Sequence, residues 1–231
     1  TIIGTATTTS YGADLGWIGM VIVHPEKRNL GIGRELLKSC LQYLNDSHIS
    51  CIKLDATPMG KKLYISFGFR EEFALKRIKG VCHNHTYDKT GIGAFSLTEV
   101  SEFDKKYFIA DRKRILERLF LEFPGLCFQS FDKSGKINGY VMVREGQMAY
   151  HLGPLISESE QISANLLNHV FSKLEGKEII FDIGEHYENI IKMLLQQGFE
   201  IQRDLYRMCI GNNPYSINNK YVVASSSAEK G

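Results

Sequence analysis

The stretch from Val21 to Leu37, V-I-V-H-P-E-K-R-N-L-G-I-G-R-E-L-L, most constrains what this chain can fold into. The apolar run that leads into it, Trp17 to Val23, is typical of a strand, and apolar residues recur at helical spacing from Ile32. Between them, Gly31 and Gly33 permit positive φ and let consecutive backbone N–H groups converge on one anion. Because a helix start also carries partial positive charge, the sequence predicts a strand, a phosphate-binding turn and a helix.

The spacing within this turn narrows the kind of phosphate. Leu36 stands three positions after Gly33, so the G-x-G-x-x-G pattern of dinucleotide-binding folds is absent, as is the G-x-x-x-x-G-K-[ST] pattern of nucleotide hydrolases. The pattern present is R-x-x-G-x-G, from Arg28 to Gly33, with the cations of Lys27 and Arg34 beside it. In these residues the chain resembles the GNAT acetyltransferase family, whose members hold the pyrophosphate of acetyl-CoA on this turn. A glycine-rich turn without a ligand is the alternative.

Composition excludes several classes of protein. The 231 residues suffice for one large or two small domains. A formal net charge of +2 with interspersed signs argues against a nucleic-acid surface. No apolar run reaches the roughly 20 residues of a membrane span, and no secretory leader is visible. The five cysteines form no C-x-x-C pair, so we expect neither a metal site nor a disulfide framework. Reduced thiols are typical of a cytoplasmic protein, and we expect this protein to be soluble and cytoplasmic. We also expect a monomer or a homodimer.

Strand and helix patterns alternate along the chain. A strand pattern is already under way at Thr1, so the resemblance implies that the first domain lacks an N-terminal piece. The expected strands are 1–10, 15–24, 49–56, 68–78, 126–131, 136–144, 148–155, 178–183 and 198–210. The expected helices are 32–45, 61–67, 101–122, 159–174 and 187–197.

The second half of the chain repeats the order of the first. Each half has a Gly-Phe pair, beginning at Gly68 and Gly198, that follows a strand ending in Asp and then a short helix. An internal duplication of one α/β unit explains this repeat better than chance. In the second copy P-L-I-S-E-S-E-Q-I-S replaces the basic turn, with no glycine and with two glutamates that repel phosphate.

We therefore expect two tandem GNAT-like domains of mixed α/β sheet structure. The first domain is predicted over 1–82, a linker over 83–93 and the second domain over 94–231. The second half resembles the auxiliary C-terminal domain of a bacterial subgroup of tandem GNAT proteins, and we expect a cofactor site in the first domain alone.

The resemblance also implies a defined acetyl-CoA site. In the family, the strand before the turn splays from its neighbour, and its backbone holds the pantetheine arm. Tyr64 occupies the family position of the acid that protonates the departing thiolate, since a phenol of pKa about 10 suits a thiol of about 8.5. An aromatic residue that fills a gap beneath the short helix is the alternative. The residues that match the cofactor contacts of the family are Val21, Ile22, Val23, Arg28, Asn29, Leu30, Gly31, Ile32, Gly33, Arg34, Asp55 and Thr57.

The general base stays open. The range 15–23 lacks the carboxylate that many family members place there, so Asp14, Glu71, Glu72, ordered water or a residue in the missing piece could serve. Three residues of the last expected strand either bind an acidic substrate group or lie on a solvated face. These are Arg203, Tyr206 and Arg207.

The resulting prediction is an acyltransferase: an acetyl-CoA-dependent N-acetyltransferase without a metal. Its acceptor is the primary amine of a small molecule, which attacks the thioester directly. The alternative is a catalytically inactive module that binds CoA or a protein partner. The identity of the acceptor stays open.

Overall fold

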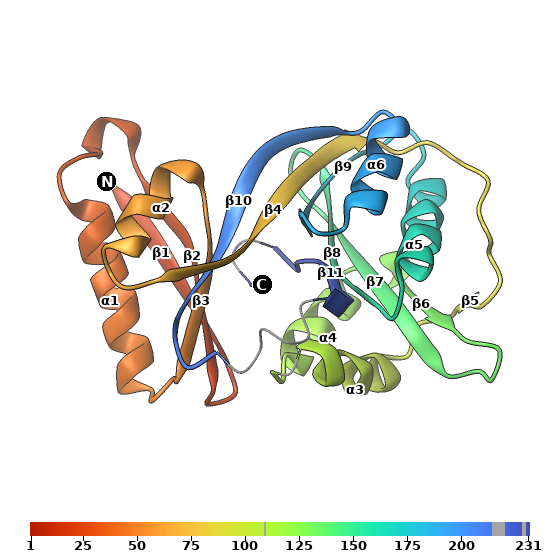
Figure 1. Ribbon diagram of the computed structural model, residues 1–231, viewed down its shortest axis with the longest axis horizontal. Helices are drawn as coiled ribbons and strands as arrows, with labels where there is room; N and C mark the ends of the chain where they lie inside the picture. The colour runs from red at the N-terminus through yellow and green to blue at the C-terminus, as the bar shows by residue number, and fades with distance from the viewer. Residues whose placement is uncertain (109, 214–219, 228–229) are drawn as a thin grey trace. The chain divides into compact units, whose positions relative to one another are not determined.

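The structure is a computed structural model that describes residues 1–108, 110–213, 220–227 and 230–231. The first half of the chain begins with an antiparallel hairpin of two strands that leads into the glycine-rich turn and a long helix (Figure 1). The elements are β1 (Gly4–Tyr11), β2 (Leu15–Val23), a 3-10 turn η1 (Pro25–Lys27), α1 (Ile32–Asp46), β3 (Cys51–Ala56), α2 (Pro58–Ile65) and β4 (Arg70–Val81).

The second half contains the same succession of elements after an additional pair of helices. The order β8, α5, β9, α6, β10 repeats the order β2, α1, β3, α2, β4, so the predicted duplication and the mixed α/β fold are confirmed. The elements are β5 (Ile92–Gly93), α3 (Leu97–Phe108), α4 (Lys113–Glu122), η2 (Pro124–Leu126), β6 (Cys127–Phe131), β7 (Ile137–Glu145), β8 (Tyr150–Ser157), α5 (Glu160–Lys173), β9 (Glu178–Gly184), α6 (Glu188–Gln196), β10 (Glu200–Gly211) and β11 (Val222–Ala224).

The chain divides into two compact units that do not follow the order of the sequence. Among the described residues, unit 1 holds 1–74, 205–213 and 230–231, and unit 2 holds the rest. The core of unit 1 lies between its sheet and α1, which buries Leu37, Cys40 and Leu44 at helical spacing. The predicted domain limits divide the sequence into consecutive ranges, whereas each unit combines ranges from both halves of the chain. The units therefore do not test those limits, which stay predictions.

Each unit completes its sheet with the last strand of the other sequence repeat. In unit 1 the strand order is β1-β2-β3-β10, so β10, and not β4, lies antiparallel beside β3. In unit 2, β4 lies antiparallel beside β9. The two repeats have therefore exchanged their final strands, which are drawn in blue (β10) and gold (β4) in Figure 1.

Two equivalent ion pairs hold the exchanged strands. Arg207 of β10 stands opposite Asp55 of β3, and its Nε and Nη2 donate to the two carboxylate oxygens over 2.8 and 2.9 Å. Arg77 of β4 stands opposite Asp182 of β9 and makes the same two bonds over 2.7 Å each. Bidentate arginine–carboxylate pairs of this kind fix orientation as well as adding energy.

The predicted single helix over 101–122 is wrong, because the chain forms α3 and α4 there. The Arg112 guanidinium is buried and its Nη2 donates to Asp104 over 2.8 Å. Eight residues of a straight helix span about 12 Å, so this contact requires the chain to turn back on itself. Two further strands were not expected: β5 falls inside the predicted linker and pairs with β6, and β11 falls in the C-terminal tail.

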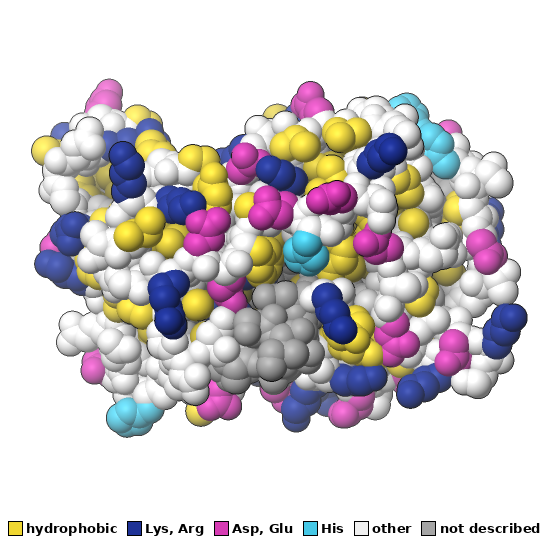
Figure 2. Space-filling view, viewed as in Figure 1, with side chains coloured by type: hydrophobic (Ala, Val, Ile, Leu, Met, Phe, Trp, Pro, Cys, Tyr) yellow, Lys and Arg dark blue, Asp and Glu magenta, His cyan; other side chains and the backbone are white. Residues whose placement is uncertain are grey.

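On the face drawn in Figure 2, basic and acidic side chains are interspersed and do not gather in one patch, which agrees with a net charge of +2. Within the described ranges, none of the helices combines the length and the apolar character that crossing a bilayer requires.

Candidate functional site

Strands β2 and β3 separate at the position where the resemblance predicted a splay. Their parallel pairing starts at Leu15 and ends at Trp17, whereas β2 continues to Val23. Beyond Trp17, Met20 has a φ of 52°, and the register between β1 and β2 shifts. Positive φ in a non-glycine residue is strained, and such residues concentrate at functional sites. The part of β2 beyond Trp17 therefore keeps β1 on one edge, and among the described residues no strand pairs with its other edge.

The turn after β2 leads to an open helix start. Asn29 and Gly31 have φ values of 64° and 81°, and Gly31 is the N-cap of α1 without a side-chain capping bond. Arg34 N–H donates back to the Gly31 carbonyl over 3.0 Å. Helix geometry gives the N–H groups of Ile32 and Gly33 no partner within α1, which leaves them able to donate to an external group.

The start of α1, the end of β2 and α2 meet at Gly33. A Cβ atom at Gly33 would lie 3.7 Å from the side chains of both Val23 and Leu63. Arg34 Nη2 also donates to Ser66 Oγ over 3.3 Å, next to the C-terminal end of α2. The structure therefore brings the predicted cofactor residues Val23, Gly33 and Arg34 together with the helix that carries Tyr64.

Exposed cations and exposed apolar side chains lie side by side around this turn. Arg28 is exposed, and its Nε donates to the Val23 carbonyl over 3.4 Å. Met20, Ile22 and Leu30 are 47%, 50% and 68% exposed. Adjoining apolar residues on a surface mark a binding site more often than isolated ones do. This combination suits a ligand that has an anionic end and an apolar arm.

Tyr64 lies on α2 and is nearly buried. Its ring packs edge-on against Phe69, with 6.0 Å between the ring centroids. Burial raises the pKa of Tyr64 to about 12, and the nearby Cys40 contributes to the increase. The Tyr64 hydroxyl is therefore a weaker acid than the ordinary phenol of pKa about 10 that the sequence predicted. It stays protonated at neutral pH.

The side chains of Asp55 and Thr57 have partners within the protein. The Asp55 carboxylate is fully buried by its pair with Arg207, whose guanidinium also lies 4.7 Å from the centre of the Trp17 ring. The Thr57 hydroxyl accepts a hydrogen bond from Gly60 N–H over 3.2 Å and so caps α2. Both side chains therefore position the strands and the helix of the site, and the Thr57 carbonyl also accepts from Gly60 N–H and Lys61 N–H at the start of α2.

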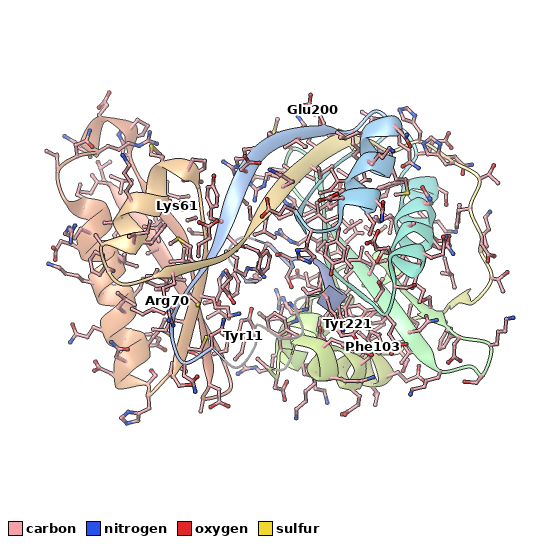
Figure 3. The ribbon with its side chains drawn as sticks, viewed as in Figure 1. Tyr11, Lys61, Arg70, Phe103, Glu200 and Tyr221 are labelled. Carbon is pink, nitrogen blue, oxygen red and sulfur yellow. The ribbon has the colours of Figure 1, made fainter. Side chains whose placement is uncertain are left out.

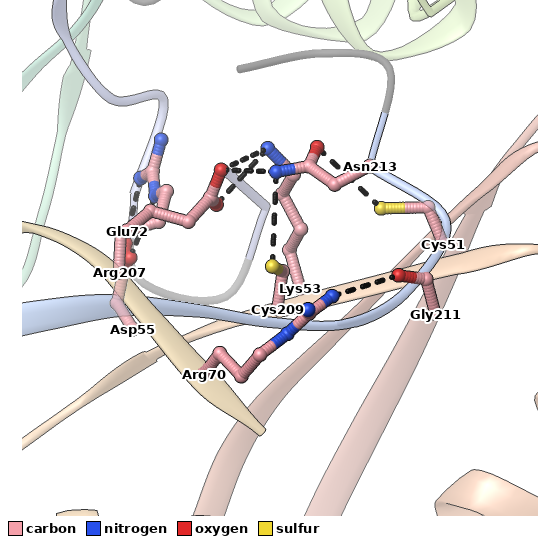
Figure 4. Close-up of polar contacts among 9 residues, drawn as sticks. All are labelled: Cys51, Lys53, Asp55, Arg70, Glu72, Arg207, Cys209, Gly211 and Asn213. Atoms are coloured by element: carbon pink, nitrogen blue, oxygen red, sulfur yellow. Dashed lines mark hydrogen bonds and ion pairs between the residues drawn. The ribbon is translucent and has the colours of Figure 1, made fainter. Parts of the chain in front are cut away.

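Glu72, one of the candidate bases, belongs to a buried polar network (Figure 4). Its carboxylate pairs with Lys53 over 3.0 Å and accepts a hydrogen bond from the Asn213 amide. Cys51 and Cys209 lie beside the same amide, and burial raises the pKa of Cys51 to about 11. A carboxylate held in this way between a cation and an amide donor has a structural role.

The other candidate bases and the three residues predicted to bind an acidic substrate group have different surroundings from Glu72. Glu71 pairs with Lys61, which is labelled in Figure 3 and whose Nζ lies 3.7 Å from the centre of the Tyr206 ring. Asp14 is exposed in the turn before β2. The structure brings Tyr206 and Arg207 together in unit 1, but Arg203 belongs to unit 2. The solvated-face alternative is wrong for Arg207, which is 4% exposed.

The second sequence repeat builds the corresponding position differently. Only Glu158 and Ser159 connect β8 to α5. The Ser159 hydroxyl accepts from Ile162 N–H over 3.3 Å, and Glu158 accepts from the Tyr107 hydroxyl. A side chain of the protein therefore occupies the helix start that is open in the first repeat.

Comparison with protein-family models identifies two adjacent domains. A model described as an acetyltransferase (GNAT) domain matches residues 100–224, and a second model with the same description matches residues 1–90. The two matches are consistent with the repeat that the sequence predicted and with the repeated order of elements.

Individual relatives are distant. The uncharacterized N-acetyltransferase YitH of Bacillus subtilis (strain 168) is 25% identical over 189 residues, which are 79% of this chain and 65% of the relative, so the chain spans less than two thirds of that protein. The holothin acyltransferase of Pseudoalteromonas sp. (strain SANK 73390) is 25% identical over 99% of this chain and 78% of its own length. A crystal structure from Pyrococcus horikoshii has a TM-score of 0.82 at 23% identity, covers 99% of this chain and 76% of that chain, and shows a shared fold.

Proposed function

Because the chain belongs to the GNAT acetyltransferase family, we propose that unit 1 binds acetyl-CoA and transfers its acetyl group to the primary amine of a small molecule. The observation that carries this proposal is the meeting of an open helix start with the open edge of β2. Gly31 to Arg34 would hold the diphosphate through backbone donors and a cation. Met20 to Val23 would hold the pantetheine arm.

The chemistry needs a proton donor for the leaving group. Acetyl-CoA supplies the acetyl group as a thioester; the amine nitrogen forms a bond to the carbonyl carbon, the carbon–sulfur bond breaks, and the amine proton passes to a base. Tyr64 would donate its phenolic proton to the departing sulfur. A phenol of pKa about 12 and a thiol of about 8.5 differ by roughly 5 kcal/mol against this transfer.

Burial of the sulfur reduces this difference. Desolvation disfavours any anion, so a thiolate beside Tyr64 has a raised pKa as well. The Cys40 thiol, which lies close enough to affect Tyr64, has its pKa raised by burial in this way. A donor and an acceptor that share one environment are therefore better matched than their ordinary values indicate.

The name of one relative bears on the acceptor class, and the state of the cysteines bears on the location of the protein in the cell. One relative, which matches 99% of this chain, is a holothin acyltransferase, and this supports a small molecule as the acceptor. All five cysteines are free, which fits a reducing compartment such as the cytoplasm. Both statements are part of the proposal.

A CoA-binding module without turnover is the second candidate. The observation in its favour is the burial of Tyr64, since the same ring completes the core cluster of unit 1 beneath α2. Release of free thiol from acetyl-CoA by the full chain, measured with a panel of primary amines, separates the two candidates. Binding of CoA without amine-dependent thiol release would favour the module.

The binding step is tested by two substitutions at one position. Gly33→Ala adds a Cβ at ordinary contact distance, 3.7 Å from its neighbours, so it should keep both the fold and CoA binding. Gly33→Glu places a carboxylate at the helix start, where it competes with the diphosphate, and it should abolish the heat of CoA binding in calorimetry. Equal binding by the two variants would contradict the placement of the diphosphate.

A further inference from the structure

In unit 2 the strands that correspond to β2 and β3 also separate, but the chain itself lies between them. The parallel pairing of β8 with β9 ends at His151. Beyond it, β11 enters between the two strands, as the dark-blue arrow in Figure 1 shows. Ala224 of β11 pairs antiparallel with Leu155 of β8 and also with Ile183 of β9. The slot between β8 and β9 is therefore filled by the C-terminal tail.

The tail is fixed in this slot by buried contacts. Val223 is 1% exposed within the core of unit 2. Ser225 N–H donates to the Asp182 carbonyl over 3.1 Å, and Ser226 Oγ accepts from Arg112 Nη1 over 3.0 Å. The same guanidinium is held by a buried carboxylate, so the anchor for the tail is itself rigid.

Gly153 of β8 makes room for the tail. It has a φ of 143°, and a Cβ atom at this position would lie 1.8 Å from the Ser225 carbonyl oxygen. Any other residue would have to displace the tail backbone. The slot is therefore shaped for the peptide that fills it.

One end of this slot lies at the start of α5, which corresponds to the glycine-rich turn of the first repeat. Residues that also contact the tail close this end. The Tyr107 hydroxyl donates a hydrogen bond to Glu158 in the connection before α5, and the Tyr107 ring centroid lies 4.4 Å from that of Tyr221. Ser159 caps α5. A pantetheine arm and a β-strand are both extended chains with amide groups, but here protein side chains already occupy the helix start that an anionic end group would need.

We propose that the slot between β8 and β9 is a binding site for an extended peptide strand and that its resident ligand is residues 222–226 of this chain. It occupies the position that corresponds to the pantetheine site of unit 1, a comparison that rests on the proposed function. Recognition combines backbone pairing on both sides, an apolar pocket for Val223 and an arginine donor for Ser226, as in other sites that bind a peptide by adding a strand.

The test detaches the tail without removing it. A protease recognition sequence is inserted after Asn213, the folded full-length protein is cleaved, and native size-exclusion chromatography reports whether the tail stays bound. The tail should co-elute with the rest of the protein and should be released by denaturant. Its loss under native conditions would overturn the proposal.

Two variants test whether contacts in the slot retain the cleaved tail. Gly153→Ala should lose the cleaved tail, whereas Gly176→Ala, at a glycine that also has positive φ (75°) but open space around its Cβ position, should keep it. Retention by Gly153→Ala would mean that other contacts hold the tail and would overturn the proposal. If Gly153→Ala does not fold, Val223→Asp replaces it, because a carboxylate at this buried position should expel the tail.

Calorimetry with CoA separates this proposal from the proposed function. We expect one CoA site per chain both in the uncleaved protein and in cleaved Gly153→Ala, from which the tail should dissociate under native conditions. A second site that arises on tail removal would mean that the slot still accepts a thioester, and it would overturn the assignment to peptide. Absence of CoA binding in both forms would refute the proposed function alone, because tail retention is measured independently.

Discussion

Removal of the Arg207 guanidinium should destabilise unit 1 by about 3–5 kcal/mol, because it leaves a buried carboxylate without its partner. The Asp55 side chain is 0% exposed, so water cannot replace the lost donor. Arg207→Met keeps much of the side-chain volume while it removes the charge. With a urea m-value of about 1.5–2 kcal/mol per molar, a loss of about 3 kcal/mol lowers the unfolding midpoint by about 1.5–2 M.

The only tryptophan of the chain makes this effect measurable for unit 1 separately. Trp17 is 1% exposed and lies in unit 1, so its fluorescence follows that unit, whereas circular dichroism follows both. The Arg207 guanidinium lies over the Trp17 ring and affects its emission. The comparison therefore uses the transition midpoint and not the intensity.

Arg77→Met is the matched control, since Arg77 makes the equivalent pair with Asp182 in unit 2. It should lower the midpoint seen by circular dichroism and leave the Trp17 midpoint in place. Its cost should be smaller, because the Arg77 side chain is 17% exposed. A Trp17 midpoint that moves by less than about 0.5 M in Arg207→Met, or by the same amount in both variants, would refute the reasoning.

Two further outcomes follow from the candidate site. Tyr64→Phe should lower kcat about 100-fold with little change in the KM for acetyl-CoA, because it removes a transition-state proton donor. Since burial raises the pKa of Tyr64 to about 12, the hydroxyl stays protonated below pH 10, and the pH–rate profile from pH 6 to 10 should have the same shape in both proteins; a limb that disappears in the variant would contradict this. Thr57→Ala should cost about 1 kcal/mol of unit 1 stability by removing the cap of α2, seen in the Trp17 midpoint, with CoA affinity nearly unchanged. A large loss of affinity at constant stability would mean that the hydroxyl contacts the ligand.

Local signals in the sequence predicted most of what surrounds the site. Gly31 and the periodic apolar residues of α1 fixed the turn and the helix, because both depend on near neighbours in the chain. The break before α4 was missed, since Asp104 and Arg112 fit one face of a continuous helix equally well. The strained Met20 left no signal, because a positive φ at a non-glycine residue is imposed by the surrounding strands.

Contacts between distant residues could not be predicted from the sequence alone. Asp55 and Arg207 are 152 positions apart, and nothing near either residue indicates that β10 should pair with β3. The one available signal was the recurrence of an Asp at the end of a strand in each repeat. Strand β11 is three residues long, which is too short for an alternating apolar and polar pattern to be recognised in the sequence. Its position also depends on a slot that other strands form.

The exchanged strands determine when unit 1 can finish folding during synthesis. The edge of β3 that β10 covers is made early, yet the ribosome must translate everything between Ala56 and Glu200 before β10 exists, a delay of about 7–30 s at about 5–20 residues per second. Through that interval the nascent chain presents a bare strand edge, which is the kind of surface that chaperones cover and that neighbouring nascent chains can pair with. We therefore expect slower translation of the second repeat to lengthen the time for which this edge of β3 lacks its partner.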